Sequence, residues 1–155
     1  MSLTKKMANV KIYASGACSG KTRRGGWCAI LSSGGHERIM YGSAENSSLE
    51  QMELLSTVKG LDALTRPCYV TLFSESHILQ TAFNNRWIEY WAQNGWRGSQ
   101  QVPEHFVEEW KTLTMYSVLH DIGFQFVGYK KIPEEFKRCR KIAEEIANGN
   151  IRKKS

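Results

Sequence analysis

Ser15 occupies a position where the surrounding sequence favours a catalytic side chain. It ends an apolar, strand-like run, and Gly16 and a turn of small and basic residues follow it. A strand that ends in a small polar residue and glycine, and then doubles back, commonly presents a catalytic group at the edge of a sheet. A carboxylate is the group expected there, whereas this sequence supplies a neutral hydroxyl.

The elements that would position Ser15 follow from the periodicity of the first half of the chain. Residues 9–15 and 26–33 are predicted to be strands, and the glycines after Ser33 predict a hairpin into a third strand over 38–44. Residues 46–64 carry apolar side chains at helical spacing, with Ser47 or Ser48 as the N-cap. The apolar run 68–74 is a further strand, and the helix before it predicts a crossover and parallel pairing.

The second half of the chain continues the alternation of helices and strands. We predict short helices over 76–83 and 86–96, a longer helix over 102–119, a strand over 124–129 and a closing helix over 133–147. Neither an internal repeat nor a low-complexity linker interrupts the pattern. The sequence therefore predicts one α/β domain over 9–148, with a flexible segment over 1–8 and a basic tail over 149–155.

The composition limits the possible classes of protein. With 155 residues, 41% of them hydrophobic, the chain has the size of one domain. No apolar run approaches the roughly 18 to 20 residues of a membrane span, so we expect a cytoplasmic protein without membrane association. The net charge of +6 suggests a polyanionic partner or a solvated basic surface. Four widely spaced cysteines predict buried free thiols; they are Cys18, Cys28, Cys68 and Cys139.

The order of the elements, together with five local strings, resembles ribonuclease HI, the enzyme that cuts RNA in RNA/DNA hybrids. The strings are "IYASGACSG…GGWCAIL", "MELLS", "LFSES", "WIEYWAQNGW" and "RCRKIA", and the likeness covers roughly residues 9–147. It implies a five-stranded mixed sheet, with three antiparallel strands followed by parallel strands, flanked by helices.

In that family, four carboxylates hold two Mg²⁺ ions that activate water and stabilise the leaving oxygen. The resemblance carries the four positions onto Ser15, Glu53, Glu75 and Arg140, so two of the four acids are replaced. A loop histidine that assists proton transfer in the family falls on Lys130.

These replacements change the charge of the pocket. At about 4 Å and an effective dielectric constant near 20, Arg140 beside a dication costs about 8 kcal/mol, so a second ion should not bind. We expect no cofactor, and we expect Arg140 to form an ion pair with both Glu53 and Glu75. Two alternatives stay open: a residual Mg²⁺ or Mn²⁺ site on Glu53 and Glu75, and recruitment of other acids. The acids considered are Glu50, Glu135 and Glu144.

The resemblance also implies a surface that recognises a duplex by its shape and phosphates. The candidate contact residues are Lys21, Arg23, Arg24, Ser48, His77, Trp91 and Arg97. The basic turn that carries Lys21, Arg23 and Arg24 either contacts phosphates or is an ordinary solvated hairpin. Trp91 either packs in the core or stacks on a base. Few basic residues surround the tryptophan-rich stretch, so we expect modest affinity that falls with salt.

Three functions follow from these observations. The first is a monomeric relative of ribonuclease HI that binds RNA/DNA hybrid or double-stranded RNA without Mg²⁺-dependent cleavage. The second is an active ribonuclease H with an altered metal site. The third is a protein-interaction module on a reused fold, in which the basic charge is incidental.

Overall fold

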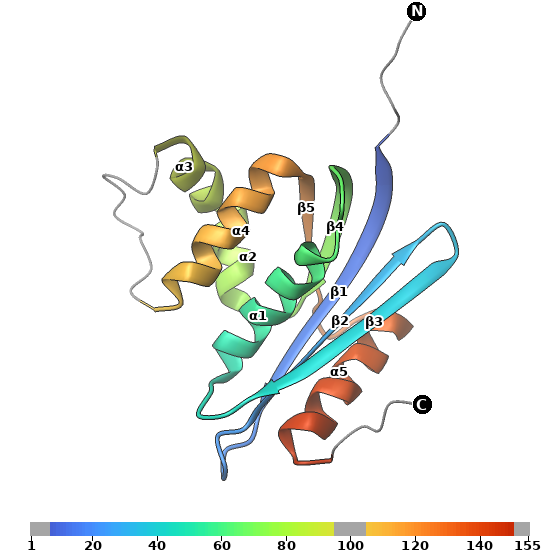
Figure 1. Cartoon of the computed structure of the whole chain (residues 1–155), viewed down its shortest axis with the longest axis vertical. Coiled ribbons are helices and arrows are strands. Elements are labelled where there is room, and N and C mark those ends of the chain that lie inside the picture. Colours follow the sequence, from blue (N-terminus) through green and yellow to red (C-terminus); the bar gives the residue numbers. More distant parts are fainter. Residues whose placement is uncertain (1–6, 95–104, 151–155) are drawn as a thin grey trace, which may run out of the picture.

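A mixed sheet in the strand order β3–β2–β1–β4–β5 runs through the centre of the computed structural model, which describes residues 7–94 and 105–150 (Figure 1). The strands are β1 (Ala8–Cys18), β2 (Gly25–Ser33), β3 (His36–Ala44), β4 (Cys68–Ser74) and β5 (Asp121–Phe126). The first three strands pair antiparallel, whereas β4 pairs parallel with both β1 and β5. The predicted hairpin, crossover and mixed sheet are therefore confirmed.

Helices cover the two faces of the sheet unequally. They are α1 (Leu49–Asp62), α2 (His77–Asn84), α3 (Trp87–Asn94), α4 (Val107–Leu119) and α5 (Glu134–Ala147). Figure 1 shows α1 to α4 on one side of the sheet and α5 on the other. Among the described helices, none has the length and apolar character needed to cross a membrane.

The alternation of side chains along β1 divides the core into two clusters. Ile12 and Ala14 point to the face covered by α1 and α4, where they join the larger apolar cluster. Tyr13 points to the opposite face, where Phe136 and Cys139 of α5 lie in the smaller cluster. Because strand side chains alternate, Ser15 shares the face of Tyr13 and lies toward α5.

Of the two N-cap residues that the sequence offers for α1, Ser47 and Ser48, the structure has Ser48. Its backbone is extended, and its Oγ accepts a hydrogen bond from the Gln51 N–H at 3.1 Å. This bond satisfies one of the free N–H groups at the start of a helix. The cap fixes where α1 begins, and the register of the helix then places Glu53 on its buried side.

Three predicted boundaries in the second half are wrong. The last strand begins at Asp121, not at residue 124, because it pairs with β4 from Tyr69 onward. It ends at Phe126, so residues 127–129 lie outside β5. Helix α4 begins at Val107, not at 102, because Phe106 adopts a left-handed conformation with φ of 59°. Residues 95–104, which include parts of two predicted helices, lie outside the described residues.

Candidate functional site

Parallel pairing of β1 and β4 brings Ser15 and Glu75 to the same end of the sheet. Tyr13 and Phe73 are register partners with stacked rings 4.7 Å apart, and each candidate residue lies two positions beyond this pair. Gly16 allows α1 to approach closely, because a Cβ there would lie 2.4 Å from the Glu53 backbone nitrogen. The topology therefore gathers the candidate positions from β1, α1 and the end of β4.

Arg140 of α5 completes this group through an ion pair with Glu75. Its Nη2 lies 2.8 Å from Glu75 Oε2, and both side chains are about one-third exposed. The guanidinium also lies over the Phe136 ring, 5.4 Å from the centroid. The expectation that Arg140 would bind both Glu53 and Glu75 is wrong in part, because the ion pair involves Glu75 alone.

Glu53 has a buried carboxyl group without a neutralising partner. It is 7% exposed, and its side chain makes no hydrogen bond or ion pair with any described residue. Burial raises the pKa of Glu53 to about 7, and the negative charges of Glu75 and Glu50 add to this effect. Near neutral pH this carboxyl group is therefore only partly ionised.

Ser15 carries a hydroxyl that is sealed inside the protein. The residue is 0% exposed, and its Oγ has no hydrogen-bond partner among the described residues. An unsatisfied buried hydroxyl costs about 1–3 kcal/mol. Ser15 Oγ is therefore an uncharged oxygen that solvent does not reach.

A pocket of about 480 Å³ opens beside the Arg140–Glu75 ion pair. Its lining comes from the residue after β4, from α2, from the end of β5 and the segment that follows it, and from α5. The lining residues are Glu75, His77, Phe126, Val127, Gly128, Tyr129, Ile132, Arg140 and Glu144. Of the acids that the sequence offered as replacements, Glu144 lines this pocket, whereas Glu50 and Glu135 do not. Within residues 7–94 and 105–150, no group of three or more His, Cys, Asp or Glu side chains is placed to hold a metal ion.

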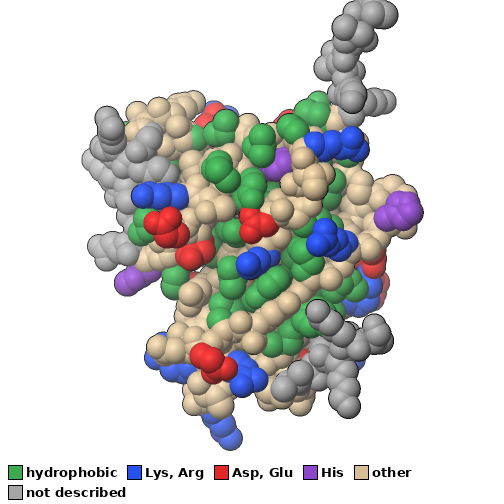
Figure 2. Space-filling model, viewed as in Figure 1, with side chains coloured by type: hydrophobic (Ala, Val, Ile, Leu, Met, Phe, Trp, Pro, Cys, Tyr) green, Lys and Arg blue, Asp and Glu red, His purple; other side chains and the backbone are tan. Residues whose placement is uncertain are grey.

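The basic turn between β1 and β2 packs against the start of α1. The Ser47 N–H donates a hydrogen bond to the Arg23 carbonyl oxygen at 2.8 Å, which joins the turn to the residues beside Ser48. Lys21 and Arg23 are exposed, whereas Arg24 forms an ion pair with Glu45 at 3.3 Å. This turn forms the lower tip of the ribbon in Figure 1, and Figure 2 shows Lys and Arg side chains at the same tip.

The remaining candidates have different surroundings. Trp91 is 1% exposed and packs edge-on against Trp110. In this conformation the side chain packs in the core and is not accessible for stacking on a base. His77 is exposed and lies 5.1 Å from the Phe126 ring. Lys130 is exposed in the loop before α5. Arg97 lies outside the described residues.

Tyr129 and Phe126 line the pocket although the sequence analysis did not select them. Tyr129 is 101% exposed and directly precedes Lys130 and Lys131. An aromatic residue beside two lysines is visible in the sequence and is a pattern that can contact a base and a phosphate. It becomes informative once the structure places the loop beside Glu75 and Arg140.

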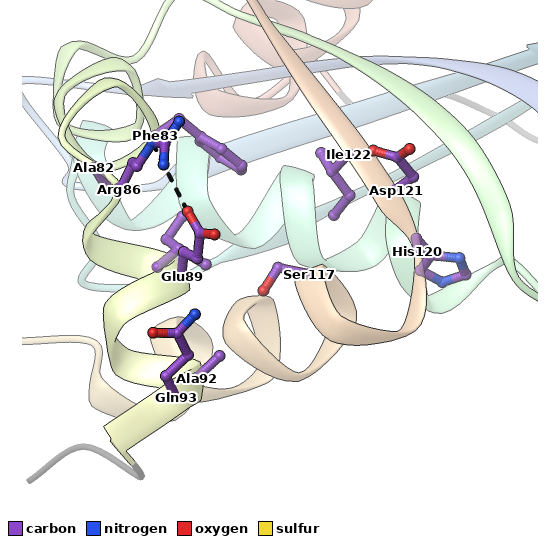
Figure 3. Close-up of a pocket in the computed structure, with 11 residues that line it drawn as sticks. Ala82, Phe83, Arg86, Glu89, Ala92, Gln93, Ser117, His120, Asp121 and Ile122 are labelled. Carbon is purple, nitrogen blue, oxygen red and sulfur yellow. Dashed lines mark ion pairs between the residues drawn. The ribbon is translucent and has the colours of Figure 1, made fainter.

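A second cavity of about 440 Å³ lies between α2, α3, the end of α4 and the start of β5 (Figure 3). Arg86 and Glu89 form an ion pair at its edge, with their atoms 3.9 Å apart. The buried Nε2 of His120 has no hydrogen-bond partner among the described residues, but Figure 3 shows the imidazole ring turned away from the other lining side chains. Its Nδ1 accepts a hydrogen bond from the Cys68 N–H at 3.1 Å. The ring thus supports β4 and is not part of a site in this cavity.

Comparison with known proteins places this arrangement in a family. The RNase H family model matches residues 7–148. The ribonuclease H of Caldanaerobacter subterraneus subsp. tengcongensis is 38% identical over 143 residues, which cover 92% of this chain and 94% of that protein. The ribonuclease H of Acetivibrio thermocellus is 36% identical over 147 residues, which cover 95% of this chain and all of that protein.

Solved structures with the same fold have lower sequence identity. LC9-RNase H1, described as a type 1 RNase H with the type 2 active-site motif, has a TM-score of 0.76 and 18% identity, over 96% of this chain and 76% of that chain. A foamy viral protease-reverse transcriptase in complex with RNA/DNA hybrid has a TM-score of 0.65 and 15% identity, over 96% of this chain and 22% of that chain. The topology, the matched family model and the extent of sequence identity together establish that this chain belongs to the ribonuclease H family.

Proposed function

We propose that this member of the ribonuclease H family binds nucleic acid and does not cleave RNA by the Mg²⁺-dependent reaction. The observation that carries the proposal is the Arg140–Glu75 ion pair, with its nitrogen and oxygen 2.8 Å apart. In a two-metal site the carboxylates surround metal cations and neutralise them. In this protein the Arg140 guanidinium lies beside Glu75 instead. Here the protein supplies the cation itself.

The charges of the four candidate residues support the loss of the metals. Glu75 and Arg140 cancel each other, Ser15 is neutral, and Glu53 is only partly ionised because burial raises its pKa to about 7. The formal charge of the group therefore lies between 0 and −1, against +4 for two Mg²⁺ ions. Mg²⁺ loses its water reluctantly and needs charged oxygen ligands in return, so these residues do not fit a pair of ions.

Several features support nucleic-acid binding. Lys21 and Arg23 are exposed on a turn that packs beside Ser48 at the start of α1. Cations on a surface of this kind bind phosphates without reading the sequence. The foamy viral protein of the same fold was solved with an RNA/DNA hybrid, which makes such a hybrid the first ligand to test.

Restoring the acids tests the loss of activity. We expect the parent protein to leave RNA/DNA hybrid intact with Mg²⁺ or Mn²⁺, and the double variant Ser15→Asp, Arg140→Asp to cleave it. Addition of Mg²⁺ should also raise the Tm of the double variant, because the added carboxylates repel one another until cations bind. Parent cleavage that disappears in Glu53→Gln would contradict the proposal, and so would a Tm rise with Mg²⁺ in the parent.

Removing the basic turn tests the binding surface. Anisotropy of a labelled hybrid, measured over a series of salt concentrations, should show weaker binding for the double variant Lys21→Ala, Arg23→Ala. The salt slope should decrease by about 2, because each phosphate contact contributes about 1. The matched control is Lys59→Ala, Arg66→Ala, which removes one exposed cation from the last turn of α1 and another from the segment between α1 and β4. Equal losses for the two variants, or no hybrid binding at low salt, would contradict the assignment.

An active ribonuclease H with an altered site is the second candidate function. Two observations favour it: the relatives named ribonuclease H are 36–38% identical, and Glu144 lines the same pocket as Glu75. In this case Mn²⁺ should support cleavage by the parent, and Glu144→Gln should abolish that cleavage. The control Glu108→Gln, on the exposed side of α4, should leave it unchanged.

A further inference from the structure

The pocket beside the Arg140–Glu75 ion pair has aromatic walls. His77 and Phe126 contact each other with ring centroids 5.1 Å apart, and Tyr129 lines the same pocket. Tyr129 is 101% exposed, and it makes no aromatic ring contact or hydrogen bond with a described residue. A planar ligand that enters the pocket therefore finds a free aromatic face without any need for the protein to unpack its core.

The polar groups of the pocket leave hydrogen-bonding capacity unused. The Arg140–Glu75 hydrogen bond occupies one guanidinium nitrogen and one carboxylate oxygen, so Nε and Nη1 of Arg140 and Oε1 of Glu75 have no partner among the described residues. The Glu144 carboxylate also makes no hydrogen bond or ion pair within the described residues. Unused acceptors and unused donors thus line one cavity.

The distribution of charge selects the kind of ligand. Glu75 and Glu144 outweigh Arg140 by one negative charge, so the lining does not favour a phosphate. Lys130 and Lys131 lie between two lining residues, Tyr129 and Ile132, and both lysines are exposed. A ligand with an uncharged planar part and an attached phosphate matches this arrangement, with the ring inside and the phosphate at the lysines.

We propose that the pocket binds an unpaired guanine base of a nucleic-acid strand. Tyr129 stacks on the base, and the lysines contact the adjacent phosphate. Guanine presents N1–H and N2–H donors side by side, which a glutamate carboxylate accepts as a pair, while its O6 accepts from Arg140. The assignment to a strand rests on the proposed nucleic-acid binding, whereas the recognition of the base rests on the pocket alone.

Titration with free nucleotides, followed by amide NMR shifts, tests recognition of the base. Guanosine monophosphate should give saturable shifts at His77, Gly128 and Tyr129. Inosine monophosphate, which lacks the N2 amino group, should bind about tenfold more weakly. Inorganic phosphate should leave these amides unchanged. Absence of shifts with guanosine monophosphate, equal affinity for both nucleotides, or the same shifts with phosphate would each overturn the proposal.

Variants with matched controls identify the residues involved. Tyr129→Ala should weaken guanosine monophosphate binding about tenfold, as loss of one stacking partner does. The control Tyr69→Ala removes another exposed tyrosine, on β4, and should have no effect. Glu144→Gln should remove the preference for guanosine over inosine monophosphate, while Glu108→Gln should keep it. Equal effects of a variant and its control would overturn the assignment.

Hybrids with different ends separate this inference from the proposed function. A hybrid with an unpaired guanine overhang should bind the parent about tenfold more tightly than a blunt hybrid, and Tyr129→Ala should remove the difference. Equal binding of blunt and overhanging hybrids would overturn the assignment to a strand. Failure of every hybrid to bind, with guanosine monophosphate still bound, would overturn the proposed function and the strand assignment while supporting the base site.

Discussion

At the scale of single residues, the Glu53 carboxyl group determines how stability depends on pH. Its pKa is about 7 in the folded protein against the ordinary value of 4.5, so the folded state binds more protons than the unfolded state between these values. Stability is therefore fully present below pH 4.5 and falls as the pH rises toward and through 7. We expect Glu53→Gln to stabilise the protein by up to about 3 kcal/mol at pH 8 and to have little effect at pH 4.5.

Urea denaturation at the two pH values measures this difference. The control Glu108→Gln changes an exposed carboxylate and should leave the pH dependence of unfolding as in the parent. A Glu53→Gln variant that is equally or less stable than the parent at pH 8 would show that Glu53 is ionised at little cost. In that case the Glu53 carboxylate would be available to a cation, and partial ionisation of Glu53 would no longer count against metal binding.

At the scale of elements, glycines set the distance between the helices and the sheet. A Cβ on Gly26 of β2 would lie 2.3 Å from the Ala143 carbonyl oxygen, inside the backbone of α5. We expect Gly26→Ala to destabilise the fold by about 3 kcal/mol, because α5 must move away from the sheet. In Gly20→Ala the new methyl group meets no atom within 4 Å, so its free energy of unfolding should stay within about 0.5 kcal/mol of the parent. Equal unfolding midpoints for the two variants would contradict this account.

The helices and strands also show which features of this fold are predictable from the sequence. The periodicity of β1 and α1, with Ser47 or Ser48 as the cap, predicted both elements, because local pattern determines them. The boundary of β5 was missed because it depends on pairing with β4, which is distant in sequence. At the candidate site, the position of Arg140 was predictable from the resemblance, but its choice of Glu75 over Glu53 was not. That choice depends on burial, which leaves Glu53 beneath the surface and Glu75 partly exposed.

At the scale of the whole molecule, the two faces of the sheet have unequal support. Of the helices in the described part of the chain, α1 to α4 cover one face and share the larger apolar cluster, whereas α5 alone covers the other (Figure 1). The lone helix carries Arg140 and Glu144, so the candidate site depends on the less supported face. An ion pair between Arg138 and Glu37 also joins α5 to β3, but both side chains are partly exposed and such pairs contribute little.

This asymmetry predicts that α5 opens before the rest of the domain. Native-state hydrogen exchange should give the α5 amides a lower opening free energy than those of α1, because detaching α5 leaves the larger cluster intact. Leu61→Ala tests the order of events. Leu61 lies in the larger cluster, so its truncation should lower the opening free energy of the α1 and β1 amides by about 3 kcal/mol. The same variant should leave the α5 amides unchanged, because a state that has lost only α5 keeps the contacts of Leu61. Parallel losses in α1 and α5 would mean instead that the two faces unfold as one unit, and that Arg140 is held as firmly as the centre of the sheet.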